Sequence, residues 1–182
     1  FALAACGGAP PPSSPSPGAP SPAASPSPPD QVLSNQAPEP TGAHVLLASL
    51  SRTACFGWCP IYSVTVYRDG VVEYQGERFV KTTGKATAHL APDRLAALDE
   101  LFTSKGYLLL DAEYTQEDAT DNPSANTAYQ PAGGAAKSVT HYRGDRSAPA
   151  ELDDIEDGFD QIVHVEQWIG TDQERRKLFG GG

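Results

Sequence analysis

Basic residues are few in this chain of 182 residues, and long apolar runs are absent from it. Thirteen Lys and Arg stand against 23 Asp and Glu, which gives a formal net charge of -10. Nucleic acids and anionic lipids attract clustered Lys and Arg, so the acidic balance argues against both as electrostatic partners. No apolar run approaches the roughly 20 residues that a membrane-spanning helix needs.

Recognisable catalytic motifs are missing as well. The sequence contains no G-x-S-x-G and no H-E-x-x-H, and its four histidines lie far apart without a common ligand spacing. Asp and Glu are abundant, but no pair of them stands out as a general acid and base. We therefore expect a protein that is not an enzyme and that carries no cofactor.

Methionine is absent, and the chain opens with an apolar segment that ends in small residues. This opening predicts that residues 1–5 are the remnant of a signal peptide. Leu3-Ala4-Ala5-Cys6 resembles the bacterial lipobox, and the resemblance implies that Cys6 carries the acyl chains of a membrane anchor. Gly7, in place of Asp, favours the outer membrane over the inner one. The alternative is an ordinary secretory signal with an incidental cysteine.

Proline dominates the next segment, since 12 of the first 40 residues are Pro and most of the others are Ser, Ala and Gly. Such a composition buries too little apolar surface to offset the entropy of ordering the chain. We expect residues 6–41 to be a lipidated Cys followed by a disordered linker that tethers a domain to the membrane. A ligand for a proline-binding module or a segment that spans the cell wall is the alternative.

Residues 42–170 have the composition and patterning of a single folded domain. Tyr62, Val64 and Val66 alternate with polar residues, and Asp69-Gly70 is a turn signal, so Ile61 to Gln75 predicts a β-hairpin. The other predicted strands lie at His44 to Leu50, Lys85 to Leu90, Thr127 to Gln130 and Ser138 to Tyr142. Residues 111–125 predict a long acidic loop.

Two segments have helical periodicity. Pro92 suits a first turn and Gly106 a helix end, with Leu95, Leu98 and Leu101 between them. A second helix is predicted from about Pro149, and residues 171–182 are expected to be a flexible tail. The fold class is therefore α+β, an antiparallel sheet of about five or six strands with two helices packed on one face.

Cys55 and Cys59 form an even pair once Cys6 is assigned to lipid. In an oxidising compartment we expect them to form a disulfide that fixes the shape of a short loop. The alternative is thiol redox chemistry or copper(I) handling, because soft thiolates select that ion, with His141 as a third ligand. Phe56 and Trp58 lie between the cysteines and are the candidate contact residues for a partner.

The segment around the cysteines also resembles a known family. Cys55-Phe-Gly-Trp-Cys59-Pro-Ile-Tyr62, followed by Asp69-Gly70 and Val72-Glu-Tyr74-Gln-Gly76, is similar to the C-F-G-x-C-P-x-Y signature of an uncharacterised domain family of bacterial lipoproteins and secreted proteins. The resemblance covers roughly residues 44 to 169. It implies export but no activity, because the function of the family is unknown.

Together these observations predict a lipid-anchored domain of the cell envelope that serves as a non-catalytic binding or structural module. Its membrane contact is expected to be the anchor at Cys6. A protein or cell-wall partner is possible for the loop at Phe56 and Trp58, whereas nucleic acid is not expected.

Overall fold

The structure is a computed structural model that describes residues 44–116 and 121–180. The predicted signal remnant at residues 1–5, the lipidation site Cys6 and the linker up to residue 41 lie outside the described residues. All elements below therefore belong to the predicted folded domain and to the segment that follows it.

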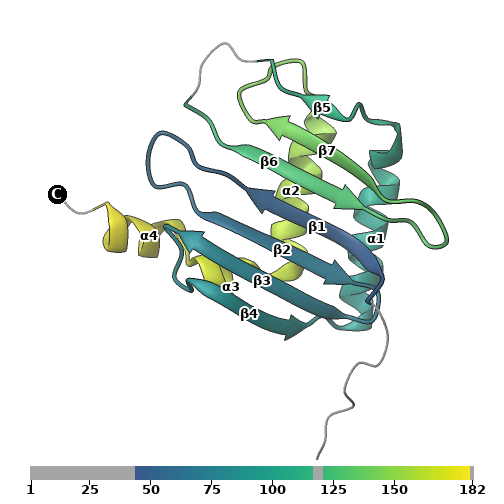
Figure 1. Cartoon of the computed structure of the whole chain (residues 1–182), viewed down its shortest axis with the longest axis horizontal. Coiled ribbons are helices and arrows are strands. Elements are labelled where there is room, and N and C mark those ends of the chain that lie inside the picture. The colour runs from purple at the N-terminus through teal and green to yellow at the C-terminus, as the bar shows by residue number, and fades with distance from the viewer. Residues whose placement is uncertain (1–43, 117–120, 181–182) are drawn as a thin grey trace, which may run out of the picture. The chain divides into compact units, whose positions relative to one another are not determined.

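One seven-stranded sheet forms the centre of the fold (Figure 1). Its strands are β1 (Leu46–Arg52), β2 (Ile61–Tyr67), β3 (Val71–Arg78), β4 (Gly84–His89), β5 (Glu113–Tyr114), β6 (Ser124–Tyr129) and β7 (Lys137–Tyr142). They are arranged in the order β4-β3-β2-β1-β6-β7-β5. Every neighbouring pair is antiparallel except β5 and β7, which are parallel. The predicted α+β fold with an antiparallel sheet is confirmed.

The sheet has one strand more than the upper end of the predicted range. β5 lies within the segment predicted as an acidic loop and consists of two residues, Glu113 and Tyr114, which pair with Thr140 and His141 of β7. The backbone N–H of Thr140 also donates to the carbonyl of Ala112. A strand of two residues is too short to show alternation, so periodicity does not detect it.

The turn between β2 and β3 explains why the predicted hairpin forms at this position. Gly70 has a φ of 93°, and the Oδ1 atom of Asp69 accepts a hydrogen bond from the backbone N–H of Val71. A Cβ atom at residue 70 would lie 2.5 Å from the His89 ring. Glycine is required here both for the backbone conformation and for the close approach of β4.

Helices α1 (Pro92–Ser104) and α2 (Ala150–Val163) cover one face of the sheet, as predicted (Figure 1). The short 3-10 helix η1 (Tyr107–Leu109) follows α1. The core lies between this layer and the sheet, and its largest fully buried apolar or aromatic side chains are Tyr62, Tyr74, Tyr107, Tyr129, Phe102, Phe159, Leu47, Leu50, Leu98, Leu152 and Ile155. Burial of this apolar and aromatic surface is the main force that holds helices and sheet together.

The structure differs from the prediction of a flexible tail at residues 171–182. After α3 (Glu166–Ile169), helix α4 (Asp172–Phe179) forms in this segment. Its start is stabilised by a capping box, in which the Thr171 hydroxyl accepts from the N–H of Glu174 and the Glu174 carboxylate accepts from the N–H of Thr171. The Phe179 ring packs edge-on against Phe79, at 5.6 Å between centroids.

Within residues 44–116 and 121–180, no helix is both long enough and apolar enough to cross a membrane.

Candidate functional site

The loop between β1 and β2 exposes two aromatic side chains. Phe56 is 89% exposed and Trp58 is 53% exposed, which is far more than for most large apolar residues of a folded domain. Cys55 and Cys59 are joined by a disulfide with a Cα–Cα distance of 5.7 Å, so the expected pairing is present. We call residues 55–59 the aromatic loop.

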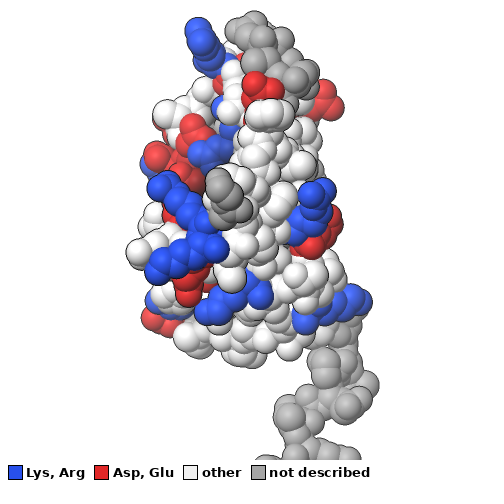
Figure 2. Space-filling view, turned by 90° about the vertical axis from the view of Figure 1, so that its left-hand side faces the viewer, with Lys and Arg blue, Asp and Glu red and all other residues white. Residues whose placement is uncertain are grey.

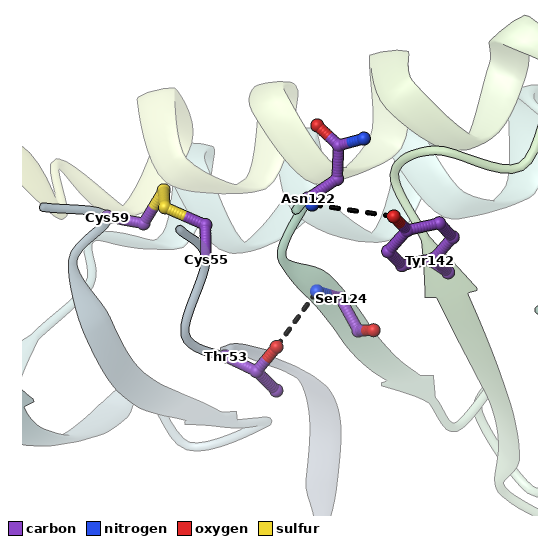
Figure 3. The surroundings of a disulfide bond; sticks show 6 residues. All are labelled: Thr53, Cys55, Cys59, Asn122, Ser124 and Tyr142. Carbon is purple, nitrogen blue, oxygen red and sulfur yellow. Dashed lines mark hydrogen bonds between the residues drawn. A yellow bond between two sulfur atoms is a disulfide. The ribbon is translucent and has the colours of Figure 1, made fainter. Parts of the chain in front are cut away.

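Hydrogen bonds connect residues at the start of the aromatic loop to neighbouring segments of the sheet (Figure 3). Thr53 exchanges two hydrogen bonds with Ser124, one through its N–H and one through its hydroxyl, which extends the pairing of β1 with β6. The N–H of Phe56 donates to the carbonyl of Asp121 at 3.0 Å. The disulfide and these bonds restrain the backbone of the aromatic loop, so that binding through it would cost little backbone ordering entropy.

Helix α4 lies beside the aromatic loop. Residues 55–60 and three side chains of α4, Asp172, Arg175 and Arg176, line a common cavity of about 360 Å³. Exposed rings and cationic side chains therefore meet at one edge of the domain, although α4 follows the loop by more than 100 residues.

Replacing Cys55 and Cys59 together by Ser is expected to reduce the free energy of unfolding by about 2 kcal/mol. The effect is small because the disulfide closes a loop of only five residues, so its removal frees little chain entropy in the unfolded state. Urea unfolding of the variant and of the wild type with and without reductant measures this effect. A variant as stable as the oxidised wild type would contradict it.

A buried group of charges lies next to the aromatic loop and is the second feature of this region. Arg52, the last residue of β1, donates to the Asp160 carboxylate through Nε at 3.0 Å and through Nη2 at 2.9 Å. The Tyr62 hydroxyl donates to the other oxygen of Asp160 at 2.7 Å. These three side chains, together with Cys59 and Arg175, are among the residues that line a neighbouring cavity of about 520 Å³.

Glu156 extends this charged group into the core. Its side chain is completely buried, and its carboxylate contacts His141 Nδ1 at 2.7 Å, Arg52 at 3.4 Å and Arg143 at 3.7 Å. Arg143 also pairs with Asp153 and Asp157 on the same helix, at 3.0 and 3.2 Å. Arg52 and Arg143 thus pair with several carboxylates of α2, and such pairing is the condition for burying the charge of Glu156.

Burial and neighbouring charges both shift the pKa values of this group. Burial works against the charge of Arg52, but Asp160, Tyr62 and Glu156 together outweigh it and raise the pKa of the guanidinium. Burial, supported by the charge of Asp160, raises the pKa of the Tyr62 phenol well above its usual value. Burial also raises the pKa of Asp160, and the charge of Arg52 opposes this shift.

His141, proposed from the sequence as a third copper ligand, lies in this group. Among the described residues, the potential ligand atoms that cluster around His141 belong to Asp153 and Glu156 and include neither cysteine. Arg143 pairs with both of these carboxylates, so the positive charge that a metal ion would supply is already present. The cysteine pair and His141 therefore belong to two different surroundings.

The sequence contains a pattern that indicates this buried group of charges, although the pattern belongs to no known motif. Asp153, Asp157 and Asp160 recur at a spacing of three or four residues in α2, so they lie on one face of the helix. Glu156 stands next to the apolar positions Leu152, Ile155 and Phe159, which predicts a buried carboxylate that needs a cation. Nothing near these residues in the sequence identifies that cation as Arg52.

Comparison with known proteins adds a family but no activity. Residues 47–163 match the family described as a domain of unknown function (DUF6438). The match includes α1, α2 and the whole sheet, except for the first residue of β1. No curated protein and no solved structure matches this chain.

Proposed function

The chain belongs to the DUF6438 family, and we propose that it is a membrane-anchored, non-catalytic binding module of the cell envelope. The observation that carries this proposal is the aromatic loop. A disulfide closes the loop and two large aromatic side chains project from it into solvent. Rigid, exposed aromatic residues supply much of the binding energy at protein interfaces and lose little entropy when they bind.

The disulfide also supports an extracytoplasmic location. Disulfides persist in oxidising compartments and are rare where thiol reductants are abundant. This agrees with the lipobox-like residues before Cys6 and with the proline-rich segment that follows them. We therefore place the protein in the cell envelope, with the outer membrane favoured over the inner one.

The buried charges favour a structural role over catalysis. The carboxylates of Glu156 and Asp160 accept hydrogen bonds from Arg52, His141 and Tyr62, so their charge is already compensated within the fold. The pKa shifts of Arg52 and Asp160 follow from burial, ion pairing and hydrogen bonding within the fold. This arrangement suits a rigid scaffold for the aromatic loop.

The anchor is tested with the variant Cys6→Ser, produced with its native export signal. We expect wild-type protein to fractionate with membranes and to carry a mass increase of acyl chains at Cys6, whereas the variant is released into the soluble envelope fraction. Cys55→Ser serves as the control, since it removes a cysteine without removing the anchor. An unmodified Cys6 in protein purified from native membranes would contradict the proposal.

The same mass measurement decides between a structural disulfide and the alternative, a thiol redox or copper(I)-handling protein that uses Cys55 and Cys59. A mass two hydrogens below that of the reduced chain supports the structural disulfide. Free thiols in the exported protein, together with binding of copper(I) by the reduced chain, would favour the alternative.

A further inference from the structure

Helix α4 carries three consecutive cationic residues, Arg175, Arg176 and Lys177, in a chain that is acidic overall. Arg176 and Lys177 are exposed, and within residues 44–116 and 121–180 neither forms a salt bridge. Figure 2 shows neighbouring Lys and Arg side chains on this side of the molecule, with Asp and Glu side chains beside them. We call these three residues the α4 cations.

The fold adds further positive charge to the same edge. Phe79 packs against Phe179 of α4, and the guanidinium of Arg78 lies 4.9 Å from the centre of the Phe79 ring. The two acidic residues of α4 are paired, Asp172 with Arg175 and Glu174 with Lys81 at 3.8 Å. Within the described residues, no carboxylate forms a salt bridge with Arg78, Arg176 or Lys177.

Arg175 and Arg176 of the α4 cations line the same cavity of about 360 Å³ as the aromatic loop, so these residues form one continuous surface. Phe56 and Trp58 project from a loop that cannot withdraw, since the disulfide and the bond to Asp121 hold it. Leu178 of α4 is also exposed, at 62%. Apolar side chains that are exposed together on one surface often mark an interaction site.

We propose that the aromatic loop and the α4 cations dock on an anionic phospholipid surface. This inference extends the proposed function, because it has the anchored domain touch the membrane through its own side chains. Guanidinium and ammonium groups bind lipid phosphates. Trp favours the interfacial region because its ring is apolar but carries an N–H, and Phe buries its apolar ring at the boundary of the acyl chains. The proposed occupant is anionic because the positive charges of Arg176 and Lys177 are exposed and form no salt bridge within the described residues.

The net charge of -10 does not oppose this docking, because screening limits electrostatic attraction to about 10 Å at 0.1 M salt. Only the charges at the contact edge act strongly on the bilayer, and each Lys or Arg near an anionic surface strengthens binding by about fivefold. An acylated Cys6 would hold the domain close to lipid, so that the docking surface would contact the membrane much of the time even if its own affinity is weak.

Docking is tested with the 182-residue chain carrying Cys6→Ser, oxidised at Cys55 and Cys59, so that no acyl chain contributes. Flotation with vesicles of phosphatidylcholine alone and with 30% phosphatidylglycerol measures the partition coefficient. We expect binding to rise with phosphatidylglycerol and to fall in 0.5 M NaCl.

Two pairs of variants locate the contact. Arg176→Glu with Lys177→Glu should weaken partitioning by more than about twentyfold, whereas the matched control Arg146→Glu with Lys85→Glu, two exposed cations outside this edge, should change it little. Phe56→Ala with Trp58→Ala should weaken it by about tenfold or more, and Leu109→Ala, which removes a 90% exposed side chain from η1, should not.

Absence of binding to vesicles with phosphatidylglycerol would overturn the docking proposal, as would equal losses in the test and control variants. Neither result would affect the anchor, which is measured separately by the mass of Cys6. Thermal unfolding of each variant verifies that the fold is retained, because surface substitutions of this kind change stability little.

Discussion

Replacing Arg52 by Met is expected to reduce the free energy of unfolding by about 3–5 kcal/mol. Met keeps an unbranched side chain of similar length, so packing changes little and the effect reports the lost charge. Glu156, which is completely buried, would keep only His141 and the more distant Arg143, and Asp160 would lose its cation. Denaturant unfolding monitored by tryptophan fluorescence measures the change.

The pH dependence of the Arg52→Met variant provides an independent test. The charge of Arg52 lowers the pKa of Asp160, so its removal should raise that pKa further. A carboxyl whose pKa is raised in the folded state favours folding below its unfolded pKa, and this contribution is lost as pH rises through the folded pKa. The variant should therefore be less destabilised at pH 4 than at pH 7.

Arg146→Met is the matched control for Arg52→Met, because Arg146 is exposed and its loss should change stability by less than about 0.5 kcal/mol. Combining Arg52→Met with Glu156→Gln should cost less than the sum of the two single changes, since both remove the same ion pair. A loss below about 1 kcal/mol for Arg52→Met would show that the buried charges do not depend on this arginine.

Replacing Phe102 by Ala is expected to cost about 3–5 kcal/mol, because it opens a cavity at the centre of the core. Phe102 is fully buried in α1 and stacks on Tyr129 of β6 at 4.8 Å between ring centroids. Its ring also meets Tyr107 edge-on at 4.9 Å. The change removes the contacts that join α1 to the sheet.

Urea unfolding of Phe102→Ala is compared with that of Phe102→Leu and Leu109→Ala. Leu refills part of the cavity, so its cost should be smaller, and Leu109 is 90% exposed, so its truncation should be nearly neutral. Equal stability of the Ala and Leu variants at position 102 would contradict the cavity argument.

Local patterns in the sequence predict most of the fold. Alternating residues and Asp69-Gly70 identify the hairpin of β2 and β3, and the 3.6-residue periodicity after Pro92 and Pro149 identifies α1 and α2. The prediction is incomplete where a segment depends on its neighbours. β5 has two residues and exists through its pairing with β7, and α4 combines a capping box with the contact of Phe179 on Phe79.

One part of the candidate site can likewise be predicted from the sequence, and the other part cannot. The aromatic loop can be recognised from the sequence, because two cysteines four positions apart enclose Phe56 and Trp58. The buried charges cannot, because Arg52 and Asp160 are 108 positions apart. A carboxylate in the apolar face of a helix predicts a cationic partner, but it does not identify which Lys, Arg or His of the chain is that partner.

Periodicity, turn chemistry and short loop closure are sufficient to predict the α+β class, the position of the hairpin and large helices, and the loop that carries the aromatic residues. Each of these features depends on residues close together in the chain. The contact of Arg52 with α2 and the position of the α4 cations beside the aromatic loop become visible only in the folded chain. Such contacts follow from strand order and helix packing, and the net charge of the whole chain does not show where cations gather on the surface.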